Sequence, residues 1–181
     1  MKVETKEPTV IEGDMIFKRF ITSGCGKGTA FLSVADALSQ NKVESDMRIS
    51  VDQVYTLMDR FQRYSKLYKA SGGVHSAALS DGRELLIFSE DVGRHNAVDK
   101  IFGRCFLEGI PTEDKVIVTS GRISSEILGK VAKKSIPIII SRSATTDMAI
   151  RTANNLGVTL IGYVRGKRMN VYANSWRVKD E

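Results

Sequence analysis

In the second half of the chain, three short apolar runs alternate with segments of helical periodicity. The runs are rich in Val and Ile and cover residues 115–119, 136–141 and 158–161, and the helical segments 123–134 and 146–156 lie between them. Strands that are apolar on both sides are typical of a sheet covered by helices on both faces. Two successive strand–helix–strand units imply parallel strands with right-handed crossovers. The pattern predicts a three-layer α/β/α domain with a mixed, mainly parallel sheet.

A long helix and a hairpin are expected ahead of these units. Ser50 and Gln53 have the spacing of a capping box, and apolar residues then recur at helical spacing as far as Tyr68. Gly72 is expected to end this helix. The Asp-Gly pair at 81–82 is a typical signal for a two-residue β-hairpin. The other expected elements are strands at 74–80, 84–88 and 169–172 and a helix at 97–107.

The length of 181 residues suits one domain with a buried core, and 42% hydrophobic and 27% charged residues are ordinary for a soluble protein. No apolar run reaches the roughly 18–20 residues that a membrane helix needs. Two cysteines without an apolar signal-peptide core predict reduced thiols in the cytoplasm. The expected segments are an N-terminal remnant at 1–16, a cysteine-loop segment at 17–49, the α/β domain at 50–175 and a C-terminal tail at 176–181.

Positive charge is concentrated in the second half of the chain. There are 27 Lys and Arg against 21 Asp and Glu, a formal net charge of +6. Residues 1–90 hold 12 basic and 12 acidic side chains, whereas residues 91–181 hold 15 and 9. Such an excess indicates an anionic partner there: nucleic acid, membrane headgroups or a phosphorylated small molecule. A solubilising surface explains the charge alone equally well.

Small polar residues and an arginine follow each of the first two apolar runs. One loop holds Ser120, Gly121 and Arg122, and the next holds Ser141 and Arg142. Ligands bind beyond the carboxyl ends of parallel strands, and both loops are expected to lead directly into helix N-termini, which favour anions. Helix capping would explain the serines, but it would not explain an arginine on both loops. We therefore expect phosphate contacts here.

The densest group of cations follows the third apolar run. Within six residues it combines Tyr163, Arg165, Gly166, Lys167 and Arg168. Arg can bind phosphate in a bidentate manner, Lys supplies a point charge, Tyr offers a face to a base, and Gly lets a ligand approach the backbone. The alternative is an exposed basic turn ahead of the last strand.

Neither histidine gives a specific signal for catalysis or for zinc. Asp91 and Arg94 could orient His95 for acid–base chemistry, but Asp91 or Asn96 as a helix cap beside a structural histidine is the favoured interpretation. His75 begins a His-Ser-Ala sequence that lacks the glutamate of the zinc deaminase motif. Two His and two Cys scattered along the chain also lack zinc-ligand spacing. We expect no zinc.

The two cysteines lie in different surroundings. Cys105 is on the apolar stripe of the expected helix at 97–107, where a buried and inert thiol is expected. Cys25 lies in the sequence TSGCGKGT at 22–29, between glycines and beside Lys27. An exposed thiol next to a cation is expected to be partly thiolate and nucleophilic. A phosphate-cradling turn is the alternative, although the glycine spacing differs from that of a P-loop.

Six segments in order along the chain resemble one family, the formate dehydrogenase accessory sulfurtransferases or FdhD/NarQ family. Two of these segments are GGVHSAAL at 72–79 and the loop around Cys25. The other four are EDVGRHNAVDK at 90–100, TSGRISSEIL at 119–128, IPIIISRSA at 136–144 and LIGYVRGKRMNVY at 160–172. The resemblance runs from about residue 17 to residue 172, which is nearly the whole chain.

The resemblance implies a sulfurtransferase. Members of the family receive sulfur as a persulfide from a cysteine desulfurase and pass it to the molybdenum cofactor, bis(molybdopterin guanine dinucleotide), before that cofactor enters formate dehydrogenase. By position, Cys25 would carry the persulfide. The segment matching the family's site for the guanine nucleotide consists of Tyr163, Val164, Arg165, Gly166, Lys167 and Arg168. The implied fold is similar to that of cytidine deaminases without zinc, and a homodimer is implied as well.

Two features depart from the family pattern. Where many members carry a Cys-x-x-Cys pair, the second position here is Gly28. Members are also longer ahead of this loop, so we expect the chain to be the main body of a longer protein. A non-catalytic chaperone for the cofactor remains the main alternative. A domain that binds RNA or DNA ranks third, because few aromatic residues lie among the cations.

Overall fold

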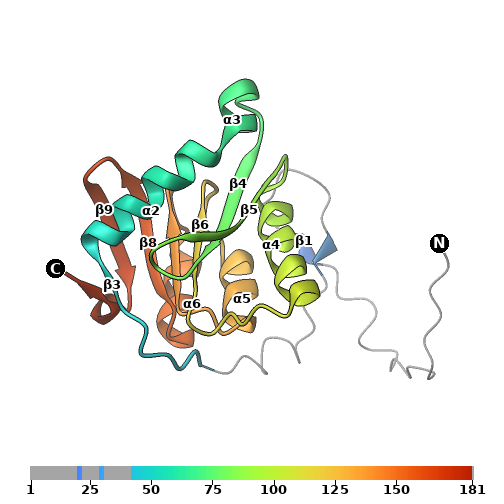
Figure 1. Cartoon of the computed structure of the whole chain (residues 1–181). Coiled ribbons are helices and arrows are strands. Elements are labelled where there is room, and N and C mark those ends of the chain that lie inside the picture. Colours follow the sequence, from blue (N-terminus) through green and yellow to red (C-terminus); the bar gives the residue numbers. More distant parts are fainter. Residues whose placement is uncertain (1–19, 22–28, 31–41, 181) are drawn as a thin grey trace, which may run out of the picture. The chain divides into compact units, whose positions relative to one another are not determined.

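The computed structural model describes the backbone at residues 20–21 and 29–30 and the chain from residue 42 to residue 180 (Figure 1). Within these residues, no helix is long and apolar enough to cross a membrane.

The chain divides into two compact units, Met1–Ser39 and Gln40–Glu181. In the first unit, β1 (Phe20–Ile21) pairs with β2 (Thr29–Ala30) in the antiparallel direction. Cys25, between these strands in the sequence, lies outside the described residues, as does the predicted N-terminal remnant.

The second unit is built on a six-stranded sheet with the strand order β5-β4-β6-β7-β8-β9. The bounds of these strands are β4 His75–Ser80, β5 Leu85–Asp91, β6 Val116–Thr119, β7 Ile138–Ser141, β8 Thr159–Arg165 and β9 Arg168–Ala173. β6, β7 and β8 are parallel to one another, but β4 is antiparallel to β5 and β6, and β9 is antiparallel to β8. The prediction of a mixed sheet is confirmed, whereas its mainly parallel character is wrong. Three of the five pairings are antiparallel: a hairpin at each end of the sheet pairs β4 with β5 and β8 with β9, and β4 also runs antiparallel to β6.

Helices cover both faces of the sheet, so the three-layer arrangement is confirmed (Figure 1). α2 packs on one face, and α4, α5 and α6 pack on the other. The helices are α2 Val51–Tyr64, α3 Lys66–Ser71, α4 Arg94–Glu108, α5 Ser125–Lys133 and α6 Asp147–Leu156.

The pleat of the central strands explains why they are apolar at nearly every position. In β7, Ile139 is buried among residues of α4, α5 and α6, whereas Ile138 and Ile140 are buried against α2. In β6, Ile117 and Val118 divide between the two faces in the same way. Successive side chains of a strand point to opposite faces, and here both faces are covered.

The expected long helix is two helices. The predicted capping box at Ser50 is present, but the helix breaks at Ser65, whose hydroxyl donates to the carbonyl of Phe61 at 3.1 Å. The amides of Leu67 and Tyr68 then donate to the carboxylate of Glu90, each at 3.1 Å, in place of helical carbonyls. A carboxylate from β5 therefore starts a new helix. That helix ends, as predicted, at Gly72, whose φ is 64°.

The hairpin between β4 and β5 has a longer loop than predicted. Ser80 pairs with Leu85, so four residues connect the strands instead of two. The Asp81 carboxylate accepts the amides of Arg83 and Glu84, each at 2.8 Å, and thereby closes the loop. The Asp-Gly signal located the turn correctly, but the side-chain contacts of Asp81 set its length.

The two ends of the described domain meet. β3 (Ile49–Ser50) pairs in parallel with β10 (Val178–Lys179), which follows the short 3-10 helix η2 (Ser175–Arg177). The buried guanidinium of Arg177 donates to the carbonyls of Gly157 at 2.8 Å and Ser45 at 3.1 Å. Much of the segment predicted as a tail is therefore held against the domain.

Candidate functional site

The predicted binding loops gather at one end of the sheet. Thr119 and Ser141, the last residues of β6 and β7, are in register. β8 ends at Arg165 and turns into β9 at Arg168 on the same end. β4 runs the other way, so it brings its first residue, His75, to this end as well. The structure thus brings together the loops that the sequence singled out and adds a histidine to them.

The loop after β6 is fixed by β4 and α4. The Ser120 amide donates to the Ser76 carbonyl at 3.0 Å, and the Ser120 hydroxyl accepts the Ser76 amide at 2.9 Å. Gly121 is buried, and a Cβ added there would lie 2.9 Å from Cβ of Arg94. Only glycine lets α4 approach this closely. Arg122, the next residue, is exposed.

The loop after β7 is tied to the loop after β6. The buried hydroxyl of Ser141 donates to the Gly121 carbonyl at 2.7 Å and accepts the Ser143 amide at 2.9 Å. The amide of Arg142 donates to the Thr119 carbonyl at 3.1 Å. Ser141 therefore holds the two loops together from a buried position and is not open to a ligand, whereas the side chain of Arg142 is partly exposed.

The two loops do not lead directly into helices, contrary to the prediction. α5 is capped by the hydroxyl of Ser124, and α6 by that of Thr146. A parallel bridge between Ile123 and Thr145 lies between the strand ends and these helices. Because this bridge extends the strand pairing beyond β6 and β7, α5 begins at Ser125 instead of residue 123, and α6 begins at Asp147 instead of residue 146.

The end of β8 presents alternate side chains to solvent. Tyr163 is 41% exposed and has a φ of 52°, at an irregularity in the β8–β9 ladder. Arg165 is exposed, with its guanidinium carbon 5.6 Å from the centroid of the Tyr163 ring and its Nε donating to the Arg142 carbonyl at 3.3 Å. Val164 is fully buried against α2, so its side chain cannot reach a ligand.

The turn from β8 to β9 is exposed and basic, which both interpretations of this segment allow. Arg165 pairs with Arg168, and Gly166 and Lys167 form the two-residue connection. Gly166 has a φ of 57°, and a Cβ there would meet nothing within 4 Å. Lys167 and Arg168 are exposed. Tyr163, Arg165, Lys167 and Arg168 thus form an open, cationic and aromatic surface.

His75 is a member of this end of the sheet that the sequence analysis missed, because it considered this residue only as a zinc ligand. Its Nδ1 lies 3.4 Å from the hydroxyl of Ser120. Burial lowers the pKa of His75 below its ordinary value of 6.5, and the nearby charges of Arg94 and Arg122 lower the pKa further. The imidazole is therefore neutral at pH 7 in a positively charged environment. His75 lies here because β4 pairs with β6 in the antiparallel direction, which brings the first residue of β4 to the end of the sheet where β6 ends.

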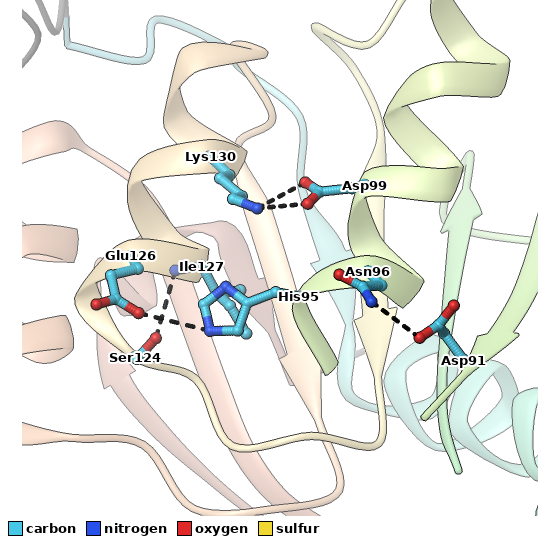
Figure 2. A network of polar contacts seen from close by, with 8 residues as sticks. All are labelled: Asp91, His95, Asn96, Asp99, Ser124, Glu126, Ile127 and Lys130. Carbon is cyan, nitrogen blue, oxygen red and sulfur yellow. Dashed lines mark hydrogen bonds and ion pairs between the residues drawn. The ribbon is translucent and has the colours of Figure 1, made fainter. Parts of the chain in front are cut away.

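His95 has a different partner from Asp91, the carboxylate that acid–base chemistry would have required. Its Nε2 lies 3.5 Å from a carboxylate oxygen of Glu126 on α5 (Figure 2). Burial lowers the pKa of His95, as do the charges of Arg94 and Lys130, although Glu126 and Asp99 oppose that shift. His95 thus links α4 to α5, next to the ion pair of Lys130 with Asp99.

Asp91 acts at the start of α4 and does not orient His95. Its carboxylate accepts a hydrogen bond from the Asn96 side chain at 3.1 Å (Figure 2). It also accepts one from the Gly93 amide at 2.9 Å, and it pairs with Lys100 at 2.6 Å. The contact with Lys100, followed by that with the Gly93 amide, lowers the pKa of Asp91 to about 2. The favoured interpretation of a structural histidine beside a helix-start carboxylate therefore agrees with the geometry.

Cys105 lies on the inner face of α4 and is buried in the core, where it is 4% exposed. Burial raises the pKa of this thiol, so it is protonated at neutral pH. This confirms the expected burial of Cys105. Among the described residues, no group of three or more His, Cys, Asp or Glu side chains is arranged to hold a metal ion.

Comparison with known proteins places the chain in a family. The FdhD/NarQ family matches residues 1–179. A protein named sulfur carrier protein FdhD from Listeria innocua is 46% identical over 163 residues, which cover 89% of this chain and 62% of that protein. A protein of the same name from Bacillus subtilis is 42% identical over 178 residues, covering 98% and 68%.

A solved structure also resembles this chain. The crystal structure of a protein described as a formate dehydrogenase accessory protein, from Desulfotalea psychrophila, has a TM-score of 0.69 and 31% identity. The match covers 77% of this chain and 62% of the other. The chain thus spans less than two thirds of the length of this protein and of the Listeria relative. With the family match, the identities and the shared fold taken together, this chain belongs to the FdhD/NarQ family.

Proposed function

We propose that this protein is a sulfurtransferase that carries sulfur as a persulfide on Cys25. The observation that carries the proposal concerns the thiols: the chain has two cysteines, and Cys105 is buried with a raised pKa. A sulfur carrier needs an accessible thiolate, and that requirement leaves Cys25, which lies outside the described residues. The relatives named sulfur carrier protein support the same role.

The chemistry of loading is a thiolate exchange. The Cys25 thiolate attacks the outer sulfur of a persulfide on a cysteine desulfurase, a new S–S bond forms, and the donor cysteine leaves as a thiolate. Electrons and sulfur atoms balance without an external oxidant or reductant. Lys27, two residues after Cys25, would stabilise the thiolate and the persulfide by its charge.

The proposed recipient is the molybdenum cofactor, bis(molybdopterin guanine dinucleotide), bound as a substrate. The open surface formed by Tyr163, Arg165, Lys167 and Arg168 suits its nucleotide end, since cations bind phosphate and Tyr163 offers a face for the base. Gly166 leaves room for close approach to the backbone. Binding of the nucleotide end would hold the cofactor on the protein during transfer, so that sulfur delivery becomes a step within one complex.

The remaining parts of the proposal concern partners and place of action. The description of the structural relative supports a role in the maturation of formate dehydrogenase. Delivery from a cysteine desulfurase, assembly as a homodimer, a cytoplasmic location and the likeness to the cytidine deaminase fold stay predictions.

A persulfide assay tests the proposal most directly. Incubation of the protein with a cysteine desulfurase and cysteine should add one sulfur, about 32 Da, to the peptide that contains Cys25. Cys25→Ala should abolish both the added mass and the activation of formate dehydrogenase. Cys105→Ser is the matched control, and it should keep both. If the Cys25→Ala protein still activates the dehydrogenase, Cys25 does not carry the sulfur and the proposed transfer is wrong.

That outcome would favour the alternative function, a non-catalytic chaperone for the cofactor. The observation behind this alternative is that the described cations, Arg142, Arg165 and Arg168 among them, need no thiol to bind a nucleotide. Calorimetry with GDP separates the two functions. Arg165→Gln with Arg168→Gln should weaken GDP binding under either function, whereas Cys25→Ala should leave GDP binding unchanged.

A further inference from the structure

The surface formed by Tyr163, Arg165, Lys167 and Arg168 is called the nucleotide surface. A second group of hydrogen-bond donors lies at the same end of the sheet, around β4 and β6 instead of β8 and β9. His75 comes from β4, Arg94 from the first turn of α4, and Arg122 from the loop after β6. These residues are close: a Cβ at Gly121 would lie 2.9 Å from Cβ of Arg94 and 3.5 Å from Nδ1 of His75. The charges of both arginines act on the His75 imidazole. Two segments far apart in the sequence therefore place cations around a histidine that comes from a third.

The side chain of His75 points to the face of the sheet that carries α4, α5 and α6. Ala77 and Leu79, two and four residues further along β4, are buried in the core on that face, and side chains alternate along a strand. Asp91, the ladder partner of His75, has its carboxylate engaged by Lys100 and by the Gly93 amide. The two charges that act on His75 are both positive.

The two halves of the edge are far enough apart to be separate subsites. β4 and β8 are separated by β6 and β7 in the sheet, and a spacing of about 4.8 Å per strand puts them roughly 14 Å apart. At that separation between the strands, His75 and the β8–β9 turn are suited to two different anionic groups. A ligand that reaches both must carry a second anionic group.

The contact with Ser120 orients the imidazole. The Ser120 hydroxyl accepts the Ser76 amide at 2.9 Å, which leaves its own proton to be donated to Nδ1 of His75, at 3.4 Å. Nδ1 then accepts, and the neutral ring carries its proton on Nε2. In this tautomer the half-buried imidazole has one donor available for an acceptor outside the protein.

From this cluster we infer a second anion subsite, formed by His75 and Arg122 with the charge of Arg94 behind them, that binds a phosphoryl group. The Nε2–H group of His75 donates to a phosphate oxygen, and Arg122, which is exposed, pairs with the same group. Arg94, 9% exposed, contributes its charge from the buried side. The inference rests on the proposed function in one respect: the ligand is a phosphate-bearing molecule whose nucleotide end occupies the β8–β9 surface.

Two substitutions of His75 separate a ligand contact from a structural role. An Asn side chain places its amide near the position of Nδ1, and a Gln side chain reaches the position of Nε2. His75→Asn should therefore keep the contact with Ser120 and lose the donor to phosphate, whereas His75→Gln should do the reverse. Calorimetry with inorganic pyrophosphate should show about tenfold weaker binding for His75→Asn and for Arg122→Gln. The affinity of His75→Gln for pyrophosphate should stay within about threefold of that of the unaltered protein. Lys179→Gln, at the exposed end of β10, is the control and should bind pyrophosphate as the unaltered protein does.

The chain has only two histidines, and this allows an independent measurement by NMR. Addition of pyrophosphate should shift the ring signals of His75 and leave those of His95 in place, because His95 lies between α4 and α5 beside Glu126. Equal shifts of both histidines, or none, would overturn the inference. So would pyrophosphate binding that His75→Asn leaves unchanged or that only His75→Gln weakens.

The inference and the proposed function can fail separately. If Arg165→Gln and Arg168→Gln leave GDP binding unchanged while His75→Asn weakens pyrophosphate binding, the nucleotide surface is misplaced and the second subsite stands. If the arginine substitutions weaken GDP binding while His75→Asn has no effect on pyrophosphate, the nucleotide surface stands and the second subsite is rejected.

Discussion

The two halves of the ligand-binding edge are built in different ways. Around β4, β6 and β7, the loops are bound to one another by buried contacts such as that of Ser141 with Gly121, and α4 packs against Gly121. Around β8 and β9, a two-residue turn presents exposed side chains on an irregular ladder, with open space at Gly166. In the first half, binding residues and packing residues are interleaved. In the second half, most predicted binding residues can be replaced without disturbing the core, with Val164 as the exception.

The sharpest test of this difference is Gly121→Ala. The new methyl would lie 2.9 Å from Cβ of Arg94, an atom fixed to the backbone of α4, so the loop or the helix must move. Overpacking of this kind costs about 2 kcal/mol of unfolding free energy. Gly103→Ala is the control, because this helical position has nothing within 4 Å and should gain about 0.5–1 kcal/mol. Urea denaturation measures both, and equal stabilities would show that the first half is not rigidly packed.

Ser141→Ala should have the next largest effect. It removes the hydrogen bond to the Gly121 carbonyl and the one from the Ser143 amide, in a buried position, at a cost of about 1.5 kcal/mol. Ser143→Ala, at a residue whose described contacts are made by its backbone, should cost much less. If both substitutions cost the same in urea denaturation, Ser141 does not hold the two loops together.

In the second half, Gly166→Ala should cost only the strain of its backbone conformation. A φ of 57° is unfavourable for alanine by about 1 kcal/mol, and no neighbour clashes with the new methyl. Gly166→Asn, which tolerates this conformation better, should cost less than the alanine substitution. A loss as large as that of Gly121→Ala would mean that the turn is packed as tightly as the first half.

The smallest expected effect is the change in the stability of the fold with pH. The pKa values of His75 and His95 are both lowered by folding, so the unfolded chain binds protons first as the pH falls. The stability that the neutral rings contribute is complete above the unfolded pKa of about 6.5 and is lost as the pH falls toward the lowered values. Urea denaturation at about pH 7.5 and pH 5.5 should show this loss, and His75→Gln with His95→Gln should reduce it. The prediction would be contradicted if the stability rose as the pH fell and if the two substitutions removed that rise.

The sequence located most elements correctly because their signals are local. The capping box at Ser50, the stop at Gly72 and the apolar runs of β6 and β7 depend on neighbouring residues, and all three are present. The break at Ser65 was not predictable in this way, because the carboxylate that starts α3 comes from Glu90, more than 20 residues away.

The candidate site shows the same division between features set by neighbouring residues and features set by contacts between distant ones. Composition and spacing indicated the cationic turn at the end of β8 and separated the buried Cys105 from Cys25, because exposure of a turn and burial of an apolar stripe follow from local patterns. The burial of Val164, the bracing role of Ser141 and the place of His75 beside Arg94 and Arg122 depend on which strands pair and in what register. Strand pairing joins residues that are distant in sequence through backbone hydrogen bonds, which no local pattern specifies. The sequence by itself therefore determined the α/β class, the family resemblance and the cationic turn at the end of β8. Only the tertiary structure decided which side chains meet at the edge of the sheet.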